Sequence, residues 1–126
     1  ERIRAELKPD AWWPAVAQGA IAVESLSAKP EITALFAALN DKPTELRVRA
    51  ERAMNKALHG SCQVPVAAYA EIHGDEMRLT GWVGDATNIR SISANAEGPV
   101  REPETLGQNV ADMLFAQGAA ELLNIP

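Results

Sequence analysis

The distribution of apolar positions between residues 41 and 60 predicts an amphipathic helix. Asp41 and Pro43 suit its first turn, because an Asp side chain accepts hydrogen bonds from free N–H groups and Pro lacks one. Gly60 predicts its end, since glycine readily adopts the left-handed conformation that closes many helices. The apolar side chains recur at intervals of three and four residues, as they do along one helical face: Leu46, Ala50, Ala53, Met54, Ala57 and Leu58. Charged residues fill the other faces, which are predicted to be solvated: Arg47, Arg49, Glu51, Arg52 and Lys56.

The pattern after this helix predicts a small antiparallel sheet. Residues 66–72 and 77–83 are typical of two strands, and the Gly74-Asp75 dipeptide between them is typical of a hairpin turn. Residues 88–96 predict a third, weaker strand. Pro103 opens a last helix, which Gly118 interrupts. Its predicted inward positions are Leu106, Val110, Met113 and Leu114. The fold class is therefore α+β, a C-terminal domain with a three-stranded antiparallel sheet covered by helices.

The pattern before residue 41 is different. Residues 19–24 are small and branched apolar residues without polar alternation, which is typical of a strand buried on both faces of a parallel or mixed sheet. No second run of this type is present, so we expect its neighbouring strands to lie outside this chain. Ser27 and Pro30 then open a helix that ends at residues 40–43. One face of this helix carries Ile32, Leu35, Phe36 and Leu39.

Composition and charge exclude some classes of function. The 126 residues are 47% apolar, which is enough for one packed domain or for pieces of more than one. A net charge of -5 argues against a nucleic-acid-binding surface, and no apolar run is long enough to span a bilayer. A single cysteine fits a reducing compartment, and we expect a cytoplasmic protein.

Cys62, the only cysteine, is predicted to lie on a turn just after a helix C-terminus, where the helix dipole disfavours a thiolate. The chain has no C-x-x-C motif, so a thiol-dependent redox module is a weak hypothesis, and the ligands of a zinc site are missing. Two interpretations remain open on these grounds. Cys62 is either a buried, inert side chain, which is the common state of a free cysteine, or a covalent anchor.

Three cationic residues share one face of the first predicted helix, namely Arg49, Arg52 and Lys56. One interpretation is a solvated face on which Glu45 pairs with Arg49. The other is that part of this face binds an acidic ligand, because guanidinium groups suit carboxylates. The two histidines of the chain are too few for a metal site, and no paired carboxylates or nucleophile triad stand out.

Two ordered stretches flank and include the cysteine. They are Glu51–Met54 (ERAM) and Leu58–Pro65 (LHGSCQVP). Together they closely resemble the cofactor-attachment signature of the porphobilinogen deaminases, also called hydroxymethylbilane synthases. Residues 15–24, 37–40 and 44–50 are similar to the same family in the same order. The resemblance therefore covers almost the whole chain.

The resemblance implies a transferase of tetrapyrrole biosynthesis. In this family a cysteine at the position of Cys62 forms a thioether to a dipyrromethane cofactor, on which four porphobilinogen units are assembled with loss of ammonia. The linear product, hydroxymethylbilane, is then released and leads to haem and chlorophyll. By the same resemblance Gln18 faces the cofactor cleft and Ser61 belongs to the cofactor site, and the complete protein is a monomer.

The resemblance also implies a division of the chain. Residues 1–14 correspond to the end of a middle domain, 15–40 to a strand and helix returning to the first domain, both upstream domains being α/β, and 41–126 to the cofactor-anchoring C-terminal domain. The family's catalytic aspartate and most of its substrate-binding arginines lie upstream, so no catalytic residue is assigned here. The missing N-terminal portion is then an obligatory partner, and this chain alone is predicted to be inactive. The competing hypothesis is a non-catalytic interaction or structural module with a free, buried Cys62.

Overall fold

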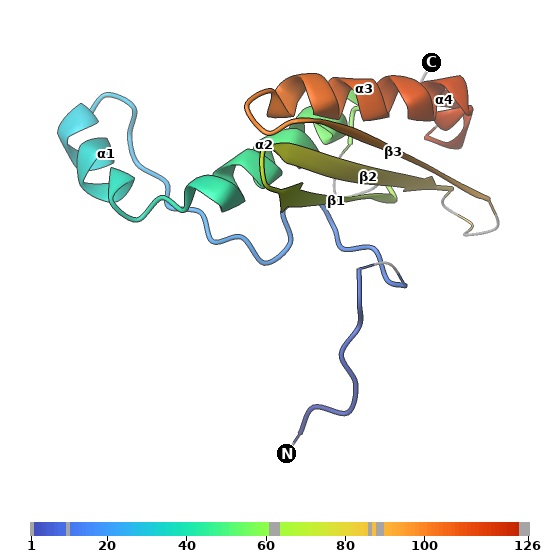
Figure 1. Cartoon of the computed structure of the whole chain (residues 1–126), viewed down its shortest axis with the longest axis horizontal. Coiled ribbons are helices and arrows are strands. Elements are labelled where there is room, and N and C mark those ends of the chain that lie inside the picture. Colours follow the sequence, from blue (N-terminus) through green and yellow to red (C-terminus); the bar gives the residue numbers. More distant parts are fainter. Residues whose placement is uncertain (1, 10, 61–63, 86, 88–89, 124–126) are drawn as a thin grey trace.

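The structure is a computed structural model that describes residues 2–9, 11–60, 64–85, 87 and 90–123. Its elements, in chain order, are α1 (Pro30–Ala37), α2 (Lys42–Ala57), β1 (Val66–His73), β2 (Glu76–Gly84), β3 (Ser91–Pro99), α3 (Pro103–Ala116) and α4 (Ala119–Leu122). Figure 1 shows α2, α3 and α4 together on one side of the three strands, while the N-terminal segment runs away from the sheet. This arrangement confirms the predicted α+β class.

The predicted N-terminal cap of α2 is confirmed. The Asp41 side chain accepts a hydrogen bond of 3.0 Å from the backbone N–H of Thr44. Pro43 lies in the first turn, where its missing N–H has no consequence for the helix. Local sequence chemistry therefore determines where α2 begins.

The end of α2 differs from the prediction in one respect. His59, and not Gly60, has the left-handed conformation, with a φ of 52°. Its N–H donates to the Lys56 carbonyl (3.2 Å), and the Gly60 N–H donates to the Asn55 carbonyl (2.8 Å), which is a Schellman closure. Gly60 instead lies close to the Asn55 side chain, which would have to move to admit a Cβ at position 60.

The sheet has the order β1-β2-β3 and is antiparallel throughout. The hairpin between β1 and β2 turns at Gly74, whose φ is 64°, and at Asp75, as predicted. The third strand is confirmed, but it is displaced along the chain from the predicted residues 88–96 to Ser91–Pro99. The displacement follows from pairing, since β3 continues until Pro99 lies opposite Glu76, the first residue of β2.

Small residues in the middle of the sheet allow the helices to pack closely. Ala68, Gly81 and Ala94 lie side by side in one cross-strand row. A Cβ at Gly81 would lie 3.0 Å from side-chain atoms of both Val110 and Leu114. The core around this row includes the fully buried side chains of Met54, Leu58, Met77, Leu79, Val83, Val110 and Leu114.

Helix α3 confirms the predicted last helix, and Gly118 interrupts it with a φ of 96°. Its inward positions include Leu106, Val110 and Leu114, as predicted. Met113 is an exception, since 43% of its surface is exposed. The stripe formed by the other three residues at intervals of four leaves position 113 on the flank of the helix.

The predicted strand at residues 19–24 is not formed by this chain. Gly19 belongs to a turn, residues 20–26 have no regular structure, and Ile21 is 95% exposed. A doubly buried strand requires hydrogen-bonded neighbours, and the described part of the chain provides none for this segment. Helix α1 forms as predicted, but it too buries no residue.

We predict that Gly107→Ala destabilises the fold by about 1–3 kcal/mol, because overpacking forces apart well-packed elements. Gly107 lies where α3 crosses α2. An added Cβ would meet the Ala50 carbonyl oxygen and would lie 2.6 Å from the Ala53 Cβ and 2.9 Å from the Met54 nitrogen. Urea unfolding followed by circular dichroism measures the change. Gly98→Ala is the matched control, because its Cβ would make only an ordinary contact of 3.7 Å with Leu106. Equal unfolding midpoints for the two variants would contradict the prediction.

Candidate functional site

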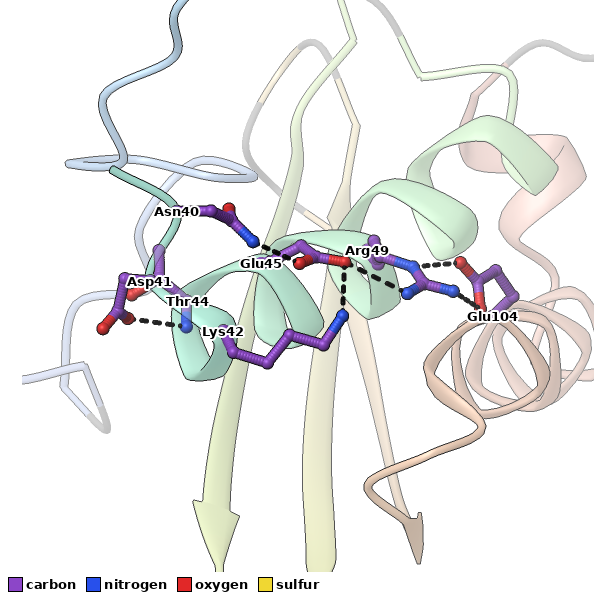
Figure 2. Close-up of polar contacts among 7 residues, drawn as sticks. All are labelled: Asn40, Asp41, Lys42, Thr44, Glu45, Arg49 and Glu104. Carbon is purple, nitrogen blue, oxygen red and sulfur yellow. Dashed lines mark hydrogen bonds and ion pairs between the residues drawn. The ribbon is translucent and has the colours of Figure 1, made fainter. Parts of the chain in front are cut away.

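Arg49, one of the three candidate cationic residues, is occupied by carboxylates. Its Nε and Nη2 donate to the Glu104 carboxylate at 2.6 and 3.0 Å, and its Nη1 lies 3.3 Å from Glu45 Oε1. Figure 2 shows this guanidinium between the two carboxylates, joining α2 to the start of α3. The predicted pairing of Arg49 with Glu45 is confirmed, and the stronger partner, Glu104, was not foreseen. Arg49 therefore serves structure, and it is not a free cation for a ligand.

The same network fixes the charge of Glu45. Its carboxylate also accepts from Lys42 Nζ at 2.9 Å and from the Asn40 side-chain amide at 2.6 Å, as Figure 2 shows. These contacts, first that of Lys42 and then that of Asn40, lower the pKa of Glu45 from 4.5 to about 2. The hydrogen bond from Arg49 likewise lowers the pKa of Glu104. Both carboxylates are therefore ionised at neutral pH.

Arg52 and Lys56 differ from Arg49 in their partners and not in their location. All three line an open recess of about 980 Å³ beside α2, together with Glu45, Glu104 and residues 19–22 and 39–41. The side chains of Arg52 and Lys56 are exposed, and neither forms an ion pair among the residues that the structure describes. Gly60 also borders this recess and directly precedes Ser61 and Cys62 in the chain. Those two candidate site residues lie outside the described residues.

Gln18 lies in a tight turn, directly before Gly19, the first residue that lines this recess. Its backbone N–H donates to the Ala15 carbonyl (3.0 Å), and its side-chain Oε1 accepts from the Ala15 N–H (2.9 Å). The residue is exposed and lines a second, smaller recess of about 440 Å³, which also contains Arg47 and Tyr69. That Gln18 faces a cofactor stays a prediction.

Glu51 is buried in α2. The helical pattern predicts a solvated position for this residue, which is wrong, because only 6% of its surface is exposed. Its Oε2 accepts from the Ala17 N–H (2.7 Å) and its Oε1 from the Ala70 N–H (3.0 Å). Burial raises the pKa of the Glu51 carboxyl, while these two N–H groups act in the opposite direction. We call this arrangement the Glu51 bridge.

A sequence signal for this burial exists. Glu51 precedes Met54 by three residues and Leu58 by seven, so all three lie on one helical stripe. Both apolar members of that stripe are fully buried. A charged residue on a buried stripe indicates specific hydrogen-bond partners, since an unpaired carboxylate would be too costly to bury.

The described residues support neither a metal site nor a membrane-spanning helix. No group of three or more His, Cys, Asp and Glu side chains there is arranged to hold a metal ion. In the same part of the chain, none of the helices combines the length and the apolar character needed to cross a membrane.

Comparison with known families decides the assignment. The family model of the porphobilinogen deaminase C-terminal domain matches residues 45–116. This range includes most of α2, the position of Cys62, all three strands and α3, which is more than half of the 126 residues. The chain belongs to the porphobilinogen deaminase family. The resemblance carried by the ERAM and LHGSCQVP stretches is thereby confirmed.

Curated porphobilinogen deaminases match almost the entire chain. It is 54% identical over 125 residues to the porphobilinogen deaminase of Stenotrophomonas maltophilia, which is 99% of this chain and 41% of that protein. It is 50% identical over 122 residues to the enzyme of that name from Xanthomonas axonopodis pv. citri, with 97% and 40% covered. The chain thus spans about two fifths of the length of the curated relatives it matches.

We predict that Glu45→Gln lowers the stability of the fold at neutral pH and has no effect on stability in strong acid. The folded pKa of Glu45 is about 2 against an ordinary value of 4.5, so its contribution is present above pH 4.5 and disappears as the pH falls towards 2. The variant should therefore be less stable than the unsubstituted protein at neutral pH and equal to it at the acid end. Urea unfolding at a series of pH values measures the difference.

The effect is expected to be small and to weaken in high salt, because Glu45 is only partly buried and remains in contact with solvent. Glu31→Gln on α1 is the control, since Glu31 makes none of these contacts. A stability difference that persists unchanged in acid would contradict the prediction.

Proposed function

We propose that the complete protein to which this chain belongs is a porphobilinogen deaminase, which joins four porphobilinogen units with loss of ammonia and releases hydroxymethylbilane. The observation that carries the proposal is the family match across residues 45–116, a range that contains Cys62. It is supported by 54% identity to a curated porphobilinogen deaminase. On this proposal the activity is a group transfer in haem and chlorophyll biosynthesis.

Cys62 is the proposed anchor of a dipyrromethane cofactor through a thioether. A thiol is a far better nucleophile than a hydroxyl at neutral pH, so one attachment reaction does not require an unusually acidic cysteine. A thioether also resists the thiol exchange that would release a disulfide-linked group in a reducing compartment. The dipyrromethane serves as the primer on which the chain of pyrroles is extended. Gln18 and Ser61 are proposed to contact it.

Among the described residues, the recess beside α2 offers two unpaired cationic side chains to an acidic ligand of this kind, while three carboxylate residues, Asp41, Glu45 and Glu104, line the same recess. Its volume of about 980 Å³ is large for a ligand pocket, and Gly60 at its border leads directly to the cysteine. The substrate pyrroles carry acetate and propionate side chains, and Arg52 and Lys56 supply cationic groups on the same wall. We therefore propose that these two residues, and not Arg49, contribute to binding of the acidic side chains.

The rest of the active site is proposed to come from the upstream portion of the same protein. The curated relatives are about two and a half times as long as this chain, which covers 41% of the first of them. On this proposal residues 1–14 end a middle domain, 15–40 return to the first domain and 41–126 form the anchoring domain. The complete protein is proposed to be a cytoplasmic monomer.

A non-catalytic module with a free cysteine is the alternative, and the family assignment does not favour it. Intact mass of the complete protein, freshly isolated, separates the two hypotheses. A covalent increment equal to two linked pyrroles supports the enzyme. An unmodified thiol supports the module.

We predict that Cys62→Ser in the complete protein abolishes covalent cofactor attachment and leaves the fold intact. The substitution changes little volume but replaces a strong nucleophile by a weak one. Intact mass measures the cofactor, and consumption of porphobilinogen measures turnover. Ser61→Ala is the matched control, because it alters the neighbouring side chain and retains the thiol, so the covalent increment should remain. A Cys62→Ser protein that still carries dipyrromethane and turns over normally would refute the anchor.

We predict that residues 1–126 alone consume no porphobilinogen. The exposed apolar side chains of residues 20–39 and the exposed Arg52 and Lys56 are interpreted as half of an active site. Adding the upstream polypeptide, or joining it covalently, should restore turnover. The complete protein assayed in parallel is the control. Turnover by the purified 126-residue chain would show that the active site is complete without the upstream portion.

A further inference from the structure

The segment before residue 19 is attached to the free edge of β1. This strand pairs only with β2 on its other side. Ala68 donates its N–H to the Pro14 carbonyl at 3.3 Å, and Ala15 forms an isolated antiparallel bridge with Ala67. Two backbone contacts therefore bring residues 14 and 15 to the edge of the sheet.

The Glu51 bridge completes this attachment from α2. The next outward N–H group of β1 is that of Ala70, and it donates to one carboxylate oxygen of Glu51. The other oxygen accepts from Ala17. Hydrogen bonds to an ionised acceptor are stronger than neutral ones, and the buried position excludes competing water. A single side chain thus joins three segments, namely residues 15–18, β1 and α2.

The backbone held in this way is strained. Ala17 has a φ of 58°, a left-handed conformation that its Cβ makes unfavourable. Such conformations persist where the surrounding structure enforces them, and they concentrate at functional sites. Gln18 follows directly, and its side chain folds back onto the N–H of Ala15. The orientation of Gln18 is consequently coupled to the hydrogen bond between Ala17 and Glu51.

We propose that Glu51 is a positioning residue, whose carboxylate fixes residues 15–18 against β1 and thereby sets the place of Gln18 relative to α2, the helix that precedes Cys62 in the chain. Glu51 and Gly60 are connected through one helix, because α2 runs on from Glu51 to the buried Leu58 and closes at Gly60. The structural half of this inference stands by itself. Its consequence for turnover rests on the proposed function.

A carboxylate is required at this position. Two backbone N–H groups need two acceptor oxygens, whereas a glutamine offers one oxygen and an NH₂ group that would face a second donor. Glu51→Gln therefore keeps the size of the side chain and breaks one arm of the bridge. Glu51→Asp keeps both oxygens but shortens the side chain.

The first test uses the unsubstituted complete protein. Hydrogen-exchange mass spectrometry of peptides covering residues 13–20 reports the amide of Ala17. We expect this amide to be protected like that of Ala70 in the sheet. Exchange at the rate of an unstructured peptide would overturn the inference without the need for any variant.

The second test compares Glu51→Gln with Glu121→Gln, a matched change at an exposed ion pair with Arg90. We expect Glu51→Gln to keep the covalent cofactor mass, to accelerate exchange at Ala17, and to lower kcat about tenfold or more with a smaller change in KM, because misplacement of a positioned group acts on the reacting geometry. Glu121→Gln should change none of these.

The outcomes are distinguishable. Faster exchange at Ala17 with unchanged kcat would refute the positioning role and leave Glu51 a purely structural residue. Absence of covalent dipyrromethane from the unsubstituted protein would refute the proposed function, while the exchange result would still decide the structural half. If Glu51→Gln does not fold, Glu51→Asp is tested in the same assays. A Glu51→Asp protein with fast exchange at the Ala17 amide and normal kcat would overturn the proposal.

Discussion

The close approach of α2 to both the sheet and α3 is the constraint on which the rest of the structure depends. Gly81 leaves room for the Met54 sulfur at the sheet, and Gly107 leaves room for the α2 backbone at Ala50. A larger residue at either glycine would push the helix away from the core. Because α2 cannot shift, every group that it carries has a defined place, which is what a site built on a helix requires.

The orientation of α2 separates its charged residues into two kinds. Glu45 lies partly exposed at the helix surface, and hydrogen bonds from Lys42, Asn40 and Arg49 lower its pKa. Glu51 points inward, and burial raises its pKa although two N–H groups stabilise its charge. Exposed ion pairs such as that of Glu45 contribute little to stability. A buried carboxylate with two backbone donors has specific partners instead, so its loss would leave those donors unpaired.

The features that sequence predicted correctly are those that depend on local chemistry. The Asp41 cap, the Gly74-Asp75 hairpin and the break at Gly118 each follow from the conformational preferences of one or two residues. The helical stripe from Leu46 to Leu58 needed only periodicity. The candidate site was identified in another way, since Cys62 stood out through an ordered motif that resembles a family and not through any spacing rule.

The features that sequence missed depend on contacts distant in the chain. Arg49 pairs with Glu104 at a separation of 55 residues, and Glu51 reaches Ala17 across 34. Neither partner is visible until α2 has been placed against α3 and β1. The left-handed residue that closes α2 is His59 and not the predicted Gly60, so the residue type alone placed the closure one position too late.

The Glu51 bridge also marks a change in how the chain obtains its structure. On its C-terminal side, from α2 onward, apolar side chains are buried by other residues of the same chain. Between Gln18 and α2 the apolar side chains are not buried in this way, since Ile21, Leu35 and Leu39 are each more than half exposed. The pattern of residues 19–24 is that of a strand between two neighbours, and an apolar run without neighbours gains nothing by becoming a strand. The failure of that prediction is therefore informative, because it locates the surface at which the upstream portion is proposed to complete the fold, only a few residues from the bridge that holds Gln18.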